Sequence, residues 1–246
     1  MNKYILLCLL LITSNSIAQV NTEAYRQDKK KLGLYHSLSL YFSSISGNSS
    51  FSSHKLNYRG DYIAQSYNSF FIYENQQRKT PSKTIANKGF SHLRLTKSFH
   101  SRFDWEFFLQ NEFNDFTLLK NRNLLGLSIR KTALSFANHS FLVSSGLMLE
   151  EEDLSSGKTS RSIRSTNYLI YKYSSPEKLK IIITSYVQPK LSEFANYRVL
   201  SDASVYYALT KHMYLTSGVN FRYNSEPPNN VKSYDLELNQ GLSFLF

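Results

Sequence analysis

The chain has 246 residues, a formal net charge of +11 and an aromatic content of 15%. Its single cysteine is Cys8, so disulfides, thiol metal sites and a cysteine nucleophile are excluded for everything after the N-terminal segment. The mean hydropathy is −0.36, and no apolar run after residue 18 approaches the length of a transmembrane helix.

Residues 1–18 are predicted to be a signal peptide. A short basic start at Asn2-Lys3 precedes an apolar run from Tyr4 to Ile12, which is too short to span a bilayer. Small residues at Ser16 and Ala18 predict cleavage before Gln19. An N-terminal membrane anchor is the alternative interpretation. Residues 19–31 are polar and charged, and we expect them to form a short periplasmic lead-in.

From residue 32 to residue 246, apolar and polar residues alternate with the period of two that indicates β-strands. We predict twelve strands, most with the nine to eleven residues or slightly more that a tilted membrane strand needs. Their expected ranges are 32–43, 53–64, 67–75, 88–98, 103–114, 121–131, 139–150, 163–173, 179–188, 195–209, 213–223 and 233–246. The predicted fold is all-β: a transmembrane, antiparallel, up-and-down β-barrel of about twelve strands.

Charged residues support this fold because they fall on one face of the predicted strands. A charge that faces lipid at mid-depth costs about 2–4 kcal/mol, whereas the outer face of a soluble β-sandwich, the alternative fold, tolerates any charge. Lys97 and Lys131 are exceptions near strand ends, where long side chains reach the interface. The charges expected to face the lumen are Arg59, Asp61, Glu74, Arg94, Glu106, Glu112, Arg130, Glu150, Arg164, Lys180, Arg198, Asp202, Arg222, Asp235 and Glu237.

The predicted connections alternate between short turns and longer polar loops, such as 76–87 and 151–162. Outer-membrane barrels have short periplasmic turns and longer external loops, so both termini are expected in the periplasm. Asn239 to Phe246 resembles the C-terminal assembly signal of bacterial outer-membrane proteins. We therefore expect the barrel assembly machinery to be a partner that reads this last strand by β-augmentation.

The net positive charge either reflects a compositional bias toward Lys and Arg or indicates one of two kinds of partner. Outer-membrane lipid, including the phosphates of lipopolysaccharide, is the first, with the basic segment Arg78 to Lys88 as a candidate contact. Nucleic acid is the second, but the export signal and the absence of stacking motifs argue against it.

No catalytic motif is apparent. Barrel lipases use His-x-Ser, and none of His36, His54, His92, His100, His139 and His212 has serine two residues later. Ser37, Ser101 and Ser140 directly follow a histidine, but neighbours in an extended strand face opposite ways. We interpret these histidines as surface or turn residues.

Glu150 to Asp153 places four acids in a predicted external loop, where they could bind Ca²⁺ or remain solvated. No phosphate loop, zinc motif or cofactor fingerprint is present. We assign no catalytic, cofactor-binding or metal residues, and expect no enzyme.

Several stretches resemble the domain of unknown function 481 family, sometimes labelled salt-induced outer-membrane proteins. The resemblance extends over nearly the whole chain after the signal peptide, except that Leu32-Gly33-Leu34-Tyr35 lacks the family's frequent glycine-tryptophan pair. The resemblance implies an outer-membrane barrel and supplies no catalytic residues. The resembling stretches are Val20 to Arg26, Gly47-Asn48, Asn57 to Tyr62, Asn87 to Arg94, Gln188 to Lys190, and Asn196 to Arg198.

The sequence thus predicts a porin-like barrel of the cell outer membrane, with an unassigned specific role as a small pore or an envelope structural protein. A lipid-acting barrel enzyme and a barrel that binds lipopolysaccharide or a partner are the alternatives.

Overall fold

The fold is a single antiparallel sheet, seen in a computed structural model that describes residues 31–47, 50–176, 178–210 and 213–244. A 3-10 helix, Asp115–Thr117, lies between β5 and β6. The strands are β1 Gly33–Ile45, β2 Phe51–Ile63, β3 Tyr67–Lys79, β4 Thr84–His100, β5 Phe103–Asn114, β6 Leu119–Phe136, β7 His139–Leu154, β8 Thr159–Ser174, β9 Leu179–Lys190, β10 Glu193–Ala208, β11 Met213–Asn224 and β12 Tyr234–Phe244.

The strands follow one another in chain order from β1 to β12, and each pairs with its sequence neighbours. This up-and-down order confirms the predicted all-β barrel topology and its twelve strands. The predicted bounds of β5 agree with the structure, and the other predicted segments each overlap one strand.

The period-two alternation sets the two faces of the sheet. In β6, for example, Leu125, Leu127 and Ile129 are 39 to 53% exposed, while Leu124, Ser128 and Arg130, which alternate with them, are buried. The strand register aligns these faces across the sheet, because Leu125 pairs with Leu109 of β5 and with Leu149 of β7. Across β5 to β7 the outward face at this level is therefore apolar, as a lipid-facing wall requires.

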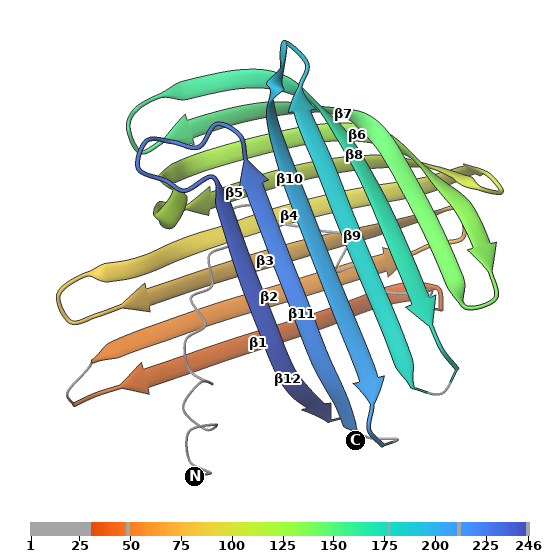
Figure 1. Ribbon diagram of the computed structural model, residues 1–246, viewed down its shortest axis with the longest axis horizontal. Helices are drawn as coiled ribbons and strands as arrows, with labels where there is room; N and C mark the ends of the chain where they lie inside the picture. Colours follow the sequence, from red (N-terminus) through yellow and green to blue (C-terminus); the bar gives the residue numbers. More distant parts are fainter. Residues whose placement is uncertain (1–30, 48–49, 177, 211–212, 245–246) are drawn as a thin grey trace, which may run out of the picture.

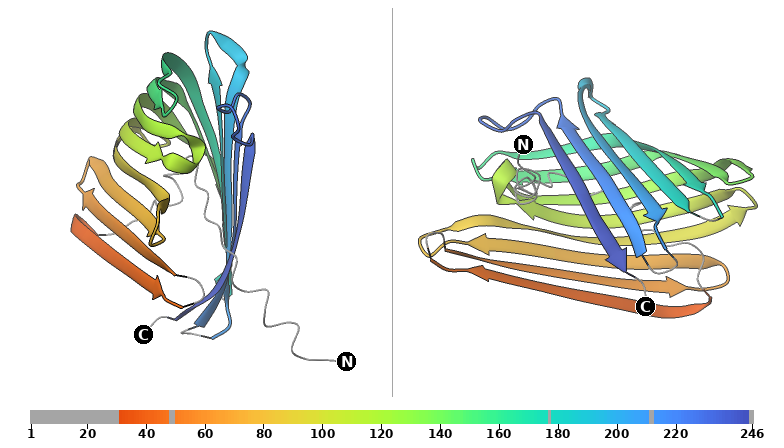
Figure 2. Two further views of the ribbon diagram at one scale, coloured as in Figure 1. Left: turned by 90° about the vertical axis from the view of Figure 1, so that its left-hand side faces the viewer. Right: turned by 60° about the horizontal axis from the view of Figure 1, so that its bottom comes forward.

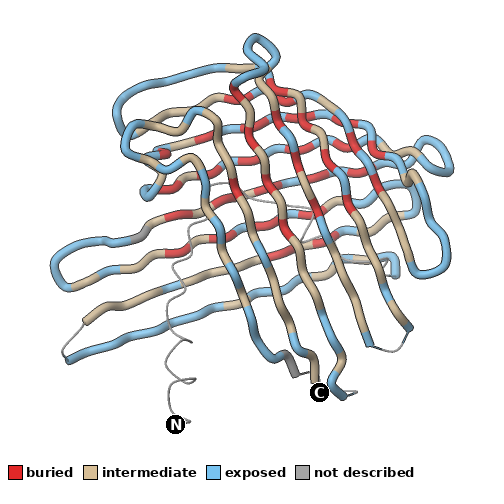
Figure 3. The backbone as a smooth tube through the Cα atoms, viewed as in Figure 1, coloured by how far each residue is buried: buried red, intermediate tan, exposed pale blue. Residues whose placement is uncertain are grey.

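The sheet coils strongly on itself. Figures 1 and 2 show β9 to β12 crossing over β1 to β4, with β5 to β8 forming the bend between them. Buried residues concentrate in the middle of the strands where the two sides face each other, and they become sparse toward β1 and β12 (Figure 3). The interior is therefore best packed around β4 to β10.

The sequence-based expectation of a closed cylinder is not met in this structure. The sheet begins at β1 and ends at β12, and these two strands do not pair with each other over the residues that the structure describes. Their edges stand apart in Figure 2. Tyr41, on the inner face of β1, is 60% exposed, so little packing holds this edge in place.

The loops predicted at one end of the barrel are mostly strand. β3 and β4 extend to Lys79 and from Thr84, and β7 and β8 extend to Leu154 and from Thr159. The expected loops 76–87 and 151–162 are thereby reduced to short turns, and the predicted alternation of long and short connections is largely lost. The longest connection joins β11 to β12 and contains Pro227 and Pro228.

The predicted signal peptide, residues 1–18, and nearly all of the lead-in, residues 19–31, lie outside the described residues. In the part of the chain that the structure does describe, no helix is long and apolar enough to cross a membrane.

Candidate functional site in the barrel interior

The charges predicted to face the lumen do lie on the inner face of the sheet. Twelve of the fifteen are buried, and the remaining three, Lys180, Asp235 and Glu237, are partly buried. An isolated buried charge is costly, so such groups are found paired. The interior of this barrel is built from such pairs.

The largest network, here named the Arg–Glu lattice, comprises Glu112, Arg122, Glu150, Glu152, Arg164 and Arg198. Its centre is Glu150, which accepts a hydrogen bond from Arg164 Nε at 2.9 Å and another from Arg198. Arg122 Nε lies 3.7 Å from the same carboxylate. One carboxylate of β7 therefore contacts guanidinium groups from β6, β8 and β10.

Glu152 and Glu112 complete the lattice. Arg122 donates through Nε and Nη2 to Glu152 at 3.0 and 2.8 Å, and it also donates to Glu112. Arg198 Nη2 donates to Glu152 at 2.7 Å. Because β7 and β10 are not neighbours in the sheet, the bonds from Arg198 cross the interior and tie its two sides together.

A second charged cluster surrounds Glu106, whose exposed fraction is 0%. Tyr168 of β8 donates its hydroxyl to Glu106 at 2.5 Å, and the guanidinium groups of Arg94 and Arg130 each lie 3.6 Å from the carboxylate. The contact between β5 and β8 is a further crossing of the interior.

Next to Glu106, aromatic rings and guanidinium groups form a ladder. His92, 1% exposed, stacks between Phe70 and Phe108 at centroid distances of 5.8 and 5.7 Å. The guanidinium of Arg94 lies over both phenylalanine rings, and its Nε donates to His92 Nε2 at 3.3 Å. The interpretation of His92 as a surface or turn residue was therefore wrong.

The interior also contains apolar side chains, which the simple rule of polar residues inward did not predict. Phe108, Leu124 and Met148 form one buried cluster, and Leu142, Tyr168, Ile170, Tyr186 and Leu200 form another. Cavities left between these groups are small: one of about 20 Å³ is lined by His92, Tyr168 and Met148. A larger one of about 270 Å³ lies beside the lattice, lined by Glu150, Arg164 and Arg198.

The acidic run Glu150 to Asp153 is part of β7 and not a loop. Alternation separates its members: Glu150 and Glu152 join the lattice, while Glu151 pairs outward with Arg161 at 2.8 Å. Asp153 accepts a hydrogen bond from Thr159. Over the described residues no group of three or more His, Cys, Asp or Glu side chains is placed to hold a metal ion.

One histidine–serine pair differs from expectation. Ser101 Oγ lies 3.3 Å from His100 Nδ1, although neighbours in a strand should face opposite ways. The reason is that β4 ends at His100 and Ser101 belongs to the following turn. Both residues are exposed.

Two members of the lattice were missing from the predicted set. Arg122 shares the parity of Arg130 within the predicted segment 121–131, so alternation alone would have placed it inside. Glu152 was assigned to a loop because the acidic run has charges on both faces, which hides the alternation.

Comparison with known proteins agrees with this architecture. No curated protein matches the sequence, whereas eight chains of solved structures match the fold. One is described as the NanC porin in a rhombohedral crystal form. It superimposes with a TM-score of 0.51 at 11% sequence identity, and the match covers 85% of this chain and 100% of the porin. At this identity the similarity concerns the fold alone.

A family model supplies the closer relationship. The model described as a protein of unknown function, DUF481, matches residues 39–246, from within β1 to the last residue. This range includes the whole Arg–Glu lattice and every strand from β2 onward. The chain belongs to the DUF481 family, as the resemblance in its sequence indicated.

Proposed function

We propose that the protein is a non-enzymatic pore of the cell outer membrane, and that the Arg–Glu lattice forms its constriction. The porin-like fold supports a membrane barrel, and the apolar outward face supports a position in lipid. The predicted signal peptide supports export. Sequencing of the mature N-terminus should then find Gln19 as the first residue.

The observation that carries the proposal is the set of hydrogen bonds from Arg198 of β10 to Glu150 and Glu152 of β7. Charge-assisted hydrogen bonds are about twice as strong as neutral ones, so the side chains are held across the interior and do not swing freely. The cavity beside these side chains has a volume of about 270 Å³. A solute that follows the inner face would have to pass through it. The expected pore is therefore narrow.

The test is conductance of the purified full-length mature protein in planar bilayers. The wild type should give small, uniform conductance steps. The paired variant Glu152→Ala/Arg198→Ala removes one cation and one carboxylate from the crossing without changing the net charge, and should give larger steps.

A matched control exists on the same hairpin. Glu151 and Arg161 form an ion pair on the outward face of β7 and β8, so Glu151→Ala/Arg161→Ala should leave the conductance unchanged. Correct insertion is checked by heat-modifiable migration on a gel. If the inserted wild type and the lattice variant are both silent, the pore proposal fails and an envelope structural role takes its place.

A further inference from the structure

The outward face of β3 to β8 carries two rows of side chains with opposite chemistry. The first row is apolar and consists of Phe71, Leu93, Leu109, Leu125, Leu149 and Ile163, each paired in register with the next. Their exposed fractions lie between 38 and 52%. This row covers six consecutive strands.

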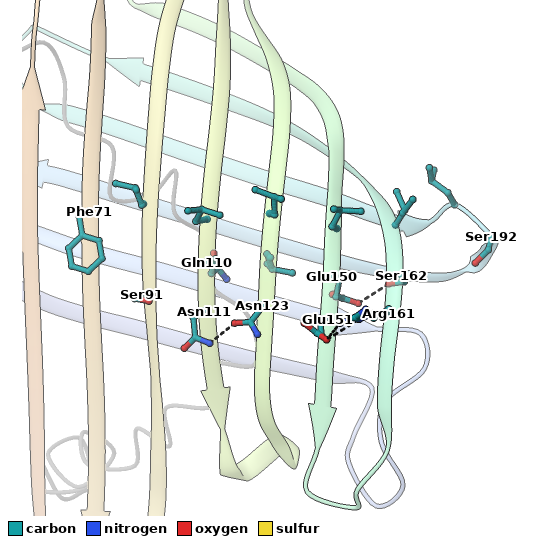
Figure 4. A pocket seen from close by; sticks show the side chains of 17 residues that line it. Phe71, Ser91, Gln110, Asn111, Asn123, Glu150, Glu151, Arg161, Ser162 and Ser192 are labelled. Atoms are coloured by element: carbon teal, nitrogen blue, oxygen red, sulfur yellow. Dashed lines mark hydrogen bonds and ion pairs between the residues drawn. The ribbon is translucent and has the colours of Figure 1, made fainter.

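The second row lies on β4 to β8, two residues from the apolar row toward one end of the sheet, and is polar. Its members, Ser91, Asn111, Asn123, Glu151 and Arg161, are again paired in register. In Figure 4 the labelled members lie between the apolar row and the arrowheads of β5 and β7. A polar row directly beside an apolar one is what the edge of a hydrocarbon layer would require.

A groove of about 1030 Å³ extends along both rows, and the β9–β10 turn with Leu191 and Ser192 borders it. This volume lies just above the usual range for ligand pockets, about 300–1,000 Å³. The volume is large enough for a lipid-sized molecule to lie along this part of the outward face.

The polar row is organised by its own hydrogen bonds. Asn111 Nδ2 donates to Asn123 Oδ1 at 2.8 Å and to Asn121 Oδ1 at 2.6 Å. Arg161 donates to Glu151, yet its side chain is 81% exposed. A fixed, exposed guanidinium beside amide groups is suited to a phosphate with neighbouring hydroxyl or ester oxygens.

We infer that this groove is a binding site for an anionic membrane lipid. The acyl chains would lie along the apolar row, and the headgroup phosphate would accept from Arg161 and from Nδ2 of Asn123, an amide that Asn111 orients by donating to its Oδ1. The site needs the protein to sit in a bilayer, as the proposed function states, but it does not need the protein to conduct. The basic turn between β3 and β4, favoured by composition alone, is not part of this groove.

The experiment is tryptophan quenching by brominated lipid, because the chain has a single tryptophan, Trp105. A Trp105→Phe/Leu109→Trp protein places the reporter in the groove. A Trp105→Phe/Val187→Trp protein places it on the outward face of β9, away from the groove and 45% exposed before substitution. Each is reconstituted in phosphatidylcholine vesicles with increasing fractions of dibrominated phosphatidylglycerol, and separately of dibrominated phosphatidylcholine.

The groove reporter should be quenched by the anionic lipid with a relative affinity about two- to fivefold above phosphatidylcholine, the range that one exposed ion pair supports. The β9 reporter should follow the bulk composition. Adding Arg161→Gln and Asn111→Ala should remove the preference in the groove, whereas the outward Lys97→Gln should preserve it.

Equal quenching by the two lipids at the groove reporter would overturn the inference, as would a preference that survives the Arg161→Gln/Asn111→Ala change. Conductance, measured on the same samples, distinguishes this failure from a failure of the pore proposal.

Discussion

At the scale of single residues, Glu150 is the carboxylate on which the interior depends most. It contacts Arg122, Arg164 and Arg198 and is 4% exposed. Removing one partner of a buried ion pair costs about 3–5 kcal/mol, because the opposite charges remain buried. We expect Glu150→Gln to lower the free energy of unfolding by this amount, measured by urea titration in detergent with Trp105 fluorescence.

The neighbouring carboxylate provides the control for that measurement. Glu151 points outward and its partner Arg161 is largely exposed, so Glu151→Gln should cost less than about 1 kcal/mol. An equal loss for both variants would contradict the buried lattice, since the two adjacent glutamates occupy opposite faces of β7 and only Glu150 is buried.

Gly126 tests the packing of the interior. A Cβ atom built on it would lie 2.1 Å from Cζ of Phe108, which covers it from the adjacent strand. Gly126→Ala should therefore displace Phe108 and destabilise the fold by about 1–3 kcal/mol, the usual cost of overpacking. Phe108→Leu in the same chain should recover part of the loss.

Gly218 is the matching position without such a neighbour, because the nearest atoms to a Cβ added there would be 3.8 Å away, at an ordinary contact distance. Gly218→Ala should leave the unfolding midpoint nearly unchanged. If Gly126→Ala were equally harmless, Phe108 would not be held where the structure places it.

At the scale of elements, two positions of strand β6 can test how deep each part of the outward face lies in the bilayer. Leu127 belongs to the apolar outward face and is 53% exposed, while Asn123, four residues earlier on the same face, belongs to the polar row. Arginine facing lipid costs about 2–4 kcal/mol at mid-depth and about 0–1 near the interface. Leu127→Arg should thus impair folding into vesicles far more than Asn123→Arg. Similar yields for the two variants would place the hydrocarbon boundary elsewhere.

The strands were predictable because alternation is a local property. Leu236 and Leu238 against Asp235 and Glu237 define β12 without any knowledge of its neighbours. The interior was less predictable, because parity says which face a residue occupies and nothing about what it meets there. Phe108 and His92 are inward by parity, yet they stack because the register of β4 and β5 makes them diagonal neighbours, and parity within one strand does not give that register.

The loop prediction failed for a related physical reason. Around Glu151 and Arg161 both faces of the β7–β8 hairpin are polar, because these residues lie beyond the end of the apolar part of the outward face. A segment without alternation looks like a loop in sequence, although its backbone continues the ladder to Asp153 paired with Thr159. The pairing partner that keeps it extended is not visible in the segment itself.

At the scale of the whole molecule, the unpaired edges of β1 and β12 set the next prediction. Unsatisfied backbone groups cost several kcal/mol each in hydrocarbon, so these edges should pair once the protein is in a bilayer. Leu40 and Leu238 lie mid-strand on the outward face. Cysteine at Leu40 combined in turn with cysteine at Leu238, Gln240 or Leu242 should give an intramolecular disulfide in one combination.

The mature chain that we predict has no cysteine, because Cys8 precedes Gln19. No native thiol would therefore compete with the introduced pair. Cross-linking also reports the register, since disulfides form only between Cα atoms about 4.4–6.8 Å apart. A Leu215→Cys/Leu242→Cys pair is the positive control, because those two residues are already partners in β11 and β12. If this pair cross-links in vesicles and none of the three combinations does, the sheet stays open.

The Arg–Glu lattice has one more consequence, which concerns ion selectivity. Its three guanidinium groups and three carboxylates balance, so in the pore that we propose this constriction would carry no excess charge that rejects one sign of ion. A salt gradient across a bilayer should produce a reversal potential near zero, and permeation should decline with the hydrated size of the solute, not with its valence. The same balance would be lost by deleting any single member, which would convert a size filter into a charge filter.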